Sequence, residues 1–188
     1  MDANRQAFLD ELYAHGRDVP EALRNVEPEA AELLGVLVRT LGAQHVLEVG
    51  TSNGYSTIWL GDAAEAVGGR VLSLDKDAER TALAQKNLVE AEVDRCVEVR
   101  TQNAAEALAA FEDASFDLIF LDAERREYAS YWPDLVRVLR DRGLLVVATT
   151  LSNAKELVEF SELVYSAEGV TSTLLTVGAG VLLIVKSP

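Results

Sequence analysis

The chain has 188 residues, of which 49% are hydrophobic and 26% are charged, a balance ordinary for a globular domain with a full hydrophobic core. Its formal net charge of −14 argues against a nucleic-acid partner, because DNA and RNA are bound mainly through clustered Lys and Arg. No apolar run is long enough to span a bilayer, and the first residues lack a signal-peptide core. We therefore expect a cytoplasmic protein with no membrane partner.

Helical periodicity comes first along the chain. An apolar face recurs over residues 2–15, which predicts one helix. A second helix is predicted over residues 27–40, with Pro28 in its first turn and Gly42 as the residue that ends it.

From residue 45 onward, short β-branched runs alternate with helical segments. Strands are predicted at 45–49, 70–75, 96–100, 116–122 and 144–149, and Gly143 directly precedes the last of them. Helices are predicted at 55–66, 77–92 and 104–111, with a further one ending near Arg140 and another at 153–167. Two closing strands, 171–177 and 181–187, are joined by a Gly-Ala-Gly turn and form an antiparallel hairpin. This order predicts an α/β fold with a doubly wound, mostly parallel sheet and helices on both faces.

Polar and small residues follow each of the predicted parallel strands. In such sheets the ligand crevice lies beyond the carboxyl ends of the strands, so these residues are the candidate site. They are Glu48, Gly50, Thr51, Ser52, Asn53, Gly54, Tyr55, Ser56, Asp75, Gln102, Asn103, Ala104, Asp122, Thr149 and Thr150.

The loop after the first strand indicates the kind of ligand. Gly50 and Gly54 are spaced G-x-x-x-G, unlike the G-x-G-x-x-G of a dinucleotide pyrophosphate site. Glu48, two residues before Gly50, would repel a pyrophosphate and suits a ligand with a cationic group. Asp75 follows the second strand, where an acid commonly binds ribose hydroxyls. These features favour S-adenosylmethionine over NAD, and the alternative role for Asp75 is to cap the helix that follows it.

Collinear motifs give the chain a resemblance to a known family. The segments "VLEVGTSNGYSTIWL", "GGRVLSLDKD", "FDLIFLDAERREY", "LRDRGLLVV" and "TLLTVGAGVLLIVK" resemble class I S-adenosylmethionine-dependent O-methyltransferases of the catechol and caffeoyl-CoA O-methyltransferase-like group. The resemblance covers residues 22–186 and implies a Rossmann-like methyltransferase fold with a seven-stranded sheet, its last strand antiparallel. It also implies a homodimer.

The resemblance also assigns roles to individual residues. By position, the methionine portion of the cofactor is surrounded by Glu48, Gly50, Ser52, Tyr55 and Ser56. Asp75 binds the ribose hydroxyls, and Asn103 or Ala104 lies at the adenine edge. Together with Thr51 and Asp122, these are the predicted cofactor-binding residues.

The sequence departs from the family at the catalytic positions. The family holds a divalent metal with the Asp that corresponds to Asp122 and with an Asp-Asn pair, which here reads Thr149-Thr150. One carboxylate and two hydroxyls make a poor Mg²⁺ site, so a divalent metal is doubtful and no metal ligands are assigned. The catalytic lysine of the family corresponds to Arg125, which stays protonated and is suited to holding an anionic substrate or a developing negative charge. The acid usual in the closing hairpin turn is missing, with Ala179 there.

Together these features predict an S-adenosylmethionine-dependent methyltransferase that O-methylates a small-molecule acceptor without a metal. Asp122 and Arg125 are the candidate catalytic residues. The chain is expected to be a single domain over 1–188, with N-terminal helices in 1–42 and the cofactor-binding core in 43–188. A non-catalytic cofactor-binding protein of the same fold is the alternative, and the loop spacing and Glu48 disfavour a dehydrogenase.

Overall fold

The computed structural model describes residues 1–18, 25–148 and 150–188, and of Arg17 and Asp18 it describes the backbone only. Its centre is a seven-stranded sheet in the order β3-β2-β1-β4-β5-β7-β6. β5 pairs with β7 and β7 with β6 in antiparallel register, whereas the other pairs are parallel. The predicted mostly parallel sheet with a C-terminal antiparallel hairpin is thus confirmed. The strands are β1 (His45–Val49), β2 (Arg70–Asp75), β3 (Val97–Thr101), β4 (Phe116–Leu121), β5 (Leu139–Val147), β6 (Val170–Leu175) and β7 (Val181–Lys186).

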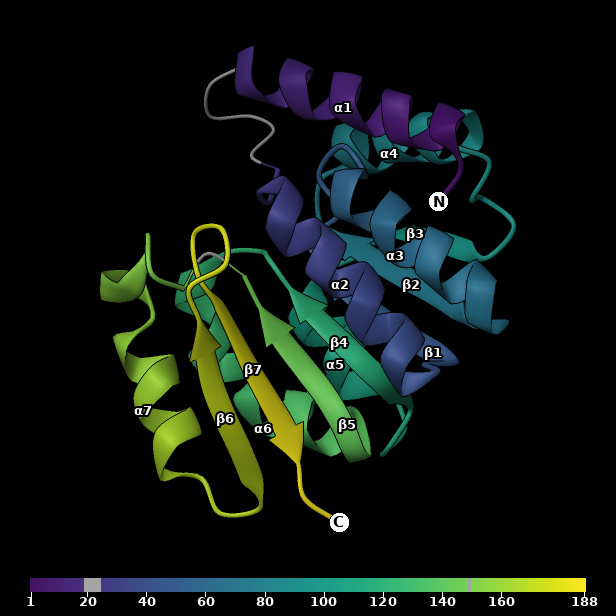
Figure 1. Cartoon of the computed structure of the whole chain (residues 1–188). Coiled ribbons are helices and arrows are strands. Elements are labelled where there is room, and N and C mark those ends of the chain that lie inside the picture. Colours follow the sequence, from purple (N-terminus) through teal and green to yellow (C-terminus); the bar gives the residue numbers. More distant parts are fainter. Residues whose placement is uncertain (19–24, 149) are drawn as a thin grey trace.

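Helices cover both faces of this sheet, as a doubly wound fold requires (Figure 1). One face carries α2 (Pro28–Leu41), α3 (Tyr55–Val67) and α4 (Ala78–Glu90), and the other carries α5 (Ala104–Ala110), α6 (Tyr128–Val138) and α7 (Val158–Ser166). α1 (Ala3–Asp18) lies across the first group, and the short helices η1 (Arg125–Glu127) and η2 (Ala154–Glu156) precede α6 and α7. Among the helices of the described residues, none has the length and apolar character that crossing a membrane requires.

Alternation along β1 decides which side chains face which layer. Leu47 and Val49 are buried in the core beneath α5 and α6, whereas Val46 is buried in the core beneath α2 and α3. By the same period of two, Glu48 points toward α3. A carboxylate is thereby placed inside an apolar layer, one residue before the chain leaves the sheet.

The predicted boundary between α6 and β5 is wrong. The helix predicted to end near Arg140 ends at Val138, and the strand predicted to begin after Gly143 begins at Leu139. Leu139 has an extended backbone, is 3% exposed and pairs with Phe116 of β4. This pairing draws the chain into the sheet early, and the register shift that follows accommodates the residues before Gly143.

A buried aspartate fixes α1 to the rest of the fold. The carboxylate of Asp62 on α3 is 2.5 Å from a guanidinium nitrogen of Arg5 on α1 and 2.5 Å from one of Arg39 on α2. Arg5 also donates to the carbonyl oxygens of Ala91 at 2.8 Å and Glu92 at 3.2 Å. Because a buried carboxylate requires partners of this kind, the pairing holds three helices in one arrangement.

Candidate active site

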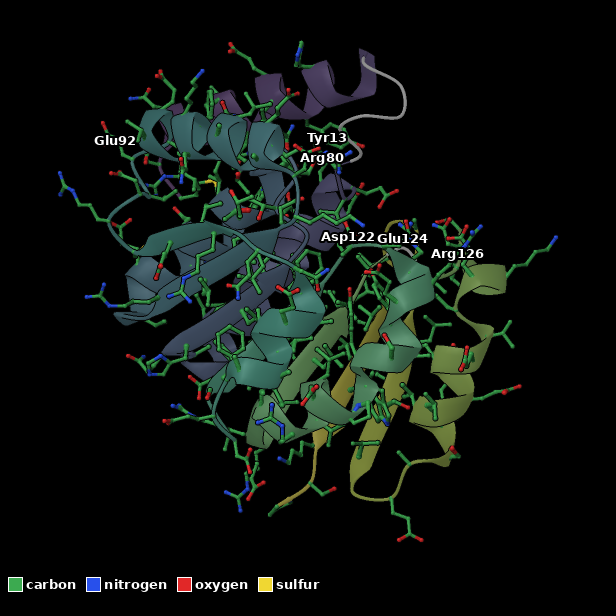
Figure 2. All side chains as sticks on the ribbon, turned by 180° about the vertical axis from the view of Figure 1, so that it is seen from behind. Tyr13, Arg80, Glu92, Asp122, Glu124 and Arg126 are labelled. Carbon is green, nitrogen blue, oxygen red and sulfur yellow. The ribbon has the colours of Figure 1, made fainter. Side chains whose placement is uncertain are left out.

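The carboxyl ends of the parallel strands open into a cavity of about 980 Å³, within the range of about 300–1,000 Å³ typical of small-molecule sites. The lining comes from the loops after β1, β2, β3, β4 and β5, together with α1, the start of α2 and the β6–β7 turn. Figure 2 shows Asp122 and Glu124 on one side of this space and Tyr13 and Arg80 across from them.

The structure divides the predicted site residues into two groups. One group lines the cavity, and the other is buried outside its described lining. The first group is Gly50, Ser52, Asp75, Asn103, Ala104, Asp122 and Arg125. The second group is Glu48, Thr51, Tyr55 and Ser56.

Glu48 is the centre of the buried group. Its carboxylate is fully buried and accepts hydrogen bonds from Ser56 Oγ at 2.6 Å, Thr57 Oγ1 at 2.5 Å and Ser73 Oγ at 2.5 Å. Thr51 joins this network through a 2.6 Å contact between its hydroxyl and that of Ser73. Burial raises the pKa of Glu48 to about 7 against the opposing effect of the hydroxyls. Glu48 therefore ties together β1, β2 and the first turn of α3 from beneath the loop.

The first glycine of the loop is required by backbone packing. Gly50 has φ +106°, and a Cβ there would lie 2.1 Å from the carbonyl oxygen of Asp122. The Asp122 amide in turn donates to the carbonyl of Val49 at 2.9 Å. Gly50 thus brings the first loop directly against the end of β4, at the point in the sheet where ligand crevices form.

Asp75 holds the same loop from the neighbouring strand. One carboxylate oxygen accepts from the Ser52 amide at 3.0 Å, and the other accepts from the Asp77 amide at 3.0 Å. The cap of α4 is Asp77, whose side chain accepts from the amides of Glu79 and Arg80. The alternative reading of Asp75 as a helix cap is therefore wrong, and its carboxylate stands at the cavity wall.

The N-terminus of α3 is closed to the cavity. Asn53 is fully buried and its Oδ1 accepts from the Tyr55 amide at 3.2 Å. Tyr55 is 3% exposed, and its ring centroid lies 5.5 Å from that of Tyr13 on α1. A pyrophosphate needs free amides at a helix N-terminus, and this helix start is occupied by packing.

The loop after β3 contributes Asn103 and Ala104. The Asn103 side chain caps α5, with Oδ1 accepting from the Ala105 amide at 2.9 Å and the Glu106 amide at 3.4 Å. Asn103 lies at the cavity wall. It is close to Asp75 of the neighbouring strand, because Thr101, two residues before it, pairs with Asp75.

Asp122 and Arg125 meet on the other side of the crevice. The Arg125 Nη2 atom lies 3.7 Å from Asp122 Oδ1, and the two side chains are 17% and 16% exposed. Burial raises the pKa of Asp122 to about 6; the Arg125 charge opposes this rise, and the Glu27 charge adds to it. Tyr128, fully buried, fixes the turn between them because its hydroxyl accepts from the Ala123 amide at 2.7 Å.

The residues present give a poor divalent-metal site. Among the described ranges, no three His, Cys, Asp or Glu side chains come together as metal ligands would. Asp122 is the one carboxylate among the residues that correspond to the family's metal ligands. The Arg125 cation lies 3.7 Å from it and would repel a metal ion there. Thr149 lies outside the described residues, and Thr150 has a buried hydroxyl without a hydrogen-bond partner in the part of the chain described.

The sequence prediction missed the N-terminal residues that line the cavity. Tyr13 of α1 and Asn25 and Glu27 at the start of α2 all contribute to its wall. A signal for Glu27 was present, because the position before a helix beginning with Pro28 favours Ser, Thr, Asp or Asn. The side chain of Glu27 makes no capping hydrogen bond, which leaves its carboxylate for the cavity.

Comparison with known proteins gives a consistent result. The profile described as O-methyltransferase matches residues 1–187. A catechol O-methyltransferase of Niastella koreensis is 34% identical over 140 residues, which cover 73% of this chain and 63% of that protein. A catechol O-methyltransferase of Mycobacterium tuberculosis is 32% identical over 165 residues, covering 81% of this chain and 74% of that protein.

The fold comparison agrees. The O-methyltransferase from Bacillus cereus, solved in complex with SAH, superposes with a TM-score of 0.81 at 28% identity. That match covers 100% of this chain and 92% of the Bacillus chain. The chain spans less than two thirds of the length of the Niastella relative.

The raised pKa of Glu48 predicts a pH-dependent stability. Below about pH 4.5 the carboxyl is protonated in both the folded and the unfolded states, so it contributes no pH dependence there. As the pH rises toward 7 the unfolded state loses the proton first, so the stability of the folded state falls. At neutral pH and above, Glu48→Gln removes this penalty. Relative to the wild type, its free energy of unfolding should rise between pH 4.5 and 7 by up to about 1.4 kcal/mol per pH unit.

Urea unfolding of both proteins at several pH values measures this difference. Glu29→Gln, an exposed carboxyl on α2, is the matched control and should run parallel to the wild type. Parallel curves for Glu48→Gln and the wild type would contradict the assignment.

Proposed function

Because the chain belongs to the O-methyltransferase family, we propose that it transfers the methyl group of S-adenosylmethionine to a hydroxyl of a small-molecule acceptor. The observation that carries the proposal is the carboxylate of Asp75 at the cavity wall. This carboxylate accepts a hydrogen bond from the Ser52 amide and so holds the loop that Glu48 supports from beneath. A carboxylate at the end of the second strand is suited to ribose hydroxyls. The Bacillus cereus relative contains SAH, S-adenosylhomocysteine, which has the same ribose.

The residues on the cofactor side have distinct proposed roles. Gly50 and Ser52 line the place of the methionine portion, and Asn103 and Ala104 lie beside the adenine. Thr51, Tyr55 and Ser56 act from beneath the cavity by keeping the loop and Glu48 in place. The cofactor supplies a methyl group on a sulfonium, whose positive charge is matched by the nearby carboxylates.

On the acceptor side, Asp122 faces the cavity as the candidate to receive the hydroxyl proton. A group with a pKa of about 6 is largely ionised at neutral pH and is suited to accepting a proton there. Arg125 beside it keeps the carboxylate oriented. Positioning of the acceptor beside the cofactor contributes much of the rate in a transfer of this type.

The proposal includes no metal, since the donor set described above does not fit one. The comparisons do not support the alternative of a non-catalytic cofactor-binding protein, because the matching family and relatives are O-methyltransferases. The closed N-terminus of α3 supports S-adenosylmethionine over a dinucleotide, and so weighs against a dehydrogenase.

The proposal extends to the organisation of the chain. We propose that residues 1–188 act as one methyltransferase domain, which the profile match over 1–187 supports. The homodimer remains a prediction from the sequence resemblance. The cytoplasmic location remains a prediction from the sequence.

Methyl transfer tests the function directly. With methyl-tritiated S-adenosylmethionine and catechol as the probe acceptor, label should move to the catechol at the same rate with EDTA and with added Mg²⁺. Asp122→Asn should lower the rate by about 100-fold, because a positioned proton acceptor contributes on that order. Loss of activity in EDTA and its recovery with Mg²⁺ would show that the metal argument is wrong.

The role of Asp75 can be tested by calorimetry with S-adenosylhomocysteine. Asp75→Asn should weaken binding by at least about tenfold, since a hydrogen bond to a charged group contributes about 1.5–3 kcal/mol. Asp77→Asn in the same loop is the control, because Asp77 caps α4 and is expected to leave affinity unchanged. Equal affinities of Asp75→Asn and the wild type would remove Asp75 from the ribose site.

A further inference from the structure

Carboxylates dominate the acceptor end of the cavity, and they limit what can bind beside the cofactor. We propose that Glu27 is a specificity-determining residue of this site and selects hydroxylated acceptors that carry a cationic group over those that carry an anionic one. This inference rests on the proposed function, because it concerns the acceptor end of the same cavity.

Glu27 is held in place by its backbone. Its carbonyl oxygen accepts from the amides of Ala30 at 2.9 Å and Ala31 at 3.0 Å, which anchors it at the start of α2. Val26 before it is 2% exposed in the core. The side chain therefore projects from a fixed point into the cavity wall.

The β6–β7 turn receives the Glu27 side chain. A Cβ at Gly178 would lie 2.9 Å from Glu27 Oε2 and 3.0 Å from Glu27 Cβ, so the carboxylate packs where the turn has no side chain. Ala179 of the same turn lines the cavity. Glu27 thus places a carboxylate beside the β6–β7 turn, where this sequence has Ala179 in place of the acid usual in the family.

The Glu27 carboxylate is uncompensated within the described residues. It makes no capping hydrogen bond, and no described cation lies within ion-pair distance of it. Glu27 and Asp122 both line the cavity, and the Glu27 charge adds to the rise in the pKa of Asp122. A ligand cation in the cavity near these two carboxylates would therefore be attracted by both.

The other described charges at the acceptor end leave its net charge negative. Arg125 is the one guanidinium there among the described lining residues, and it lies 3.7 Å from Asp122. Glu127 lines the wall and accepts from the hydroxyl of Tyr131, and Glu124 is an exposed carboxylate at the rim. The remaining lining cations, Lys76 and Arg80, follow β2 beside Asp75, on the cofactor side.

Among the lining residues that the structure describes, the balance of charge at the acceptor end is therefore negative. The sequence suggested that Arg125 would hold an anionic substrate, but its charge is already offset by Asp122. An anionic substituent would have to approach Glu27 and Asp122 in a partly desolvated space, where like charges repel strongly. A cationic substituent would gain from the same field.

Three catechols of nearly equal shape test the inference: 3,4-dihydroxybenzylamine, 3,4-dihydroxybenzyl alcohol and 3,4-dihydroxybenzoate. Their affinities are measured by ligand-observed NMR titration with the cavity saturated by S-adenosylhomocysteine, which carries no sulfonium charge. The wild type should bind the amine at least about tenfold more tightly than the carboxylate, with the alcohol between them.

Glu27→Gln should reduce this preference at least about fivefold, because it removes the negative charge. Glu27→Lys should invert the preference, because it replaces the negative charge with a positive one at the same position. Glu29→Gln, exposed in the first turn of the same helix, is the matched control and should keep the wild-type preference. The affinity for S-adenosylhomocysteine should stay unchanged in Glu27→Gln, which shows that the variant is folded.

The outcomes separate the two proposals. If the protein does not bind S-adenosylhomocysteine, the proposed function fails and this inference fails with it. If it does bind, then equal or tighter binding of the carboxylate overturns the inference alone. An amine-to-carboxylate ratio that Glu27→Gln leaves unchanged, or binding of none of the catechols, overturns it as well.

Discussion

The carboxyl group of Glu48 is fully buried in an apolar layer, and three hydroxyls from β2 and α3 converge on it. A buried carboxylate without such partners would cost several kcal/mol, so the strand end, the loop and the helix start must keep the positions that supply them. Gly50 follows directly and brings the loop against Asp122, while Asp75 holds the Ser52 amide from the next strand. The cofactor side of the cavity is therefore a consequence of satisfying one buried carboxyl group.

The opposite wall depends on packing between elements far apart in the sequence. Asp62 fixes α1 through Arg5, so that Tyr13 reaches the cavity, and the start of α2 brings Glu27 against the β6–β7 turn. The same space thus contains carboxylates placed by α2, β2 and β4. Their common sign suits a sulfonium cofactor and a transfer that needs a proton acceptor near the acceptor hydroxyl.

The sequence carried enough information for the sheet and for the loops at its carboxyl edge. Short apolar runs such as the one ending at Val49 are typical of parallel strands covered on both faces, and parallel connectivity then brings Glu48, Asp75 and Asp122 to one edge. Sequence reasoning could not separate residues that line the cavity from those that support it. Glu48 and Gly50 belong to the same motif, and only tertiary packing decides that Gly50 lines the cavity and Glu48 is buried beneath it. It also missed Glu27, since the contact with Gly178 joins two segments that no local pattern connects. The early start of β5 was missed because the pairing of Leu139 with Phe116 overrides the helical pattern around it.

The central claim is that the loop built around Glu48 accepts a sulfonium nucleoside and rejects a dinucleotide. Titration calorimetry of the unmodified protein with S-adenosylmethionine and, separately, with NAD tests this claim most directly. The account predicts saturable binding of S-adenosylmethionine with one molecule per chain and no heat of binding with NAD. Saturable binding of NAD, or no binding of S-adenosylmethionine, would contradict it.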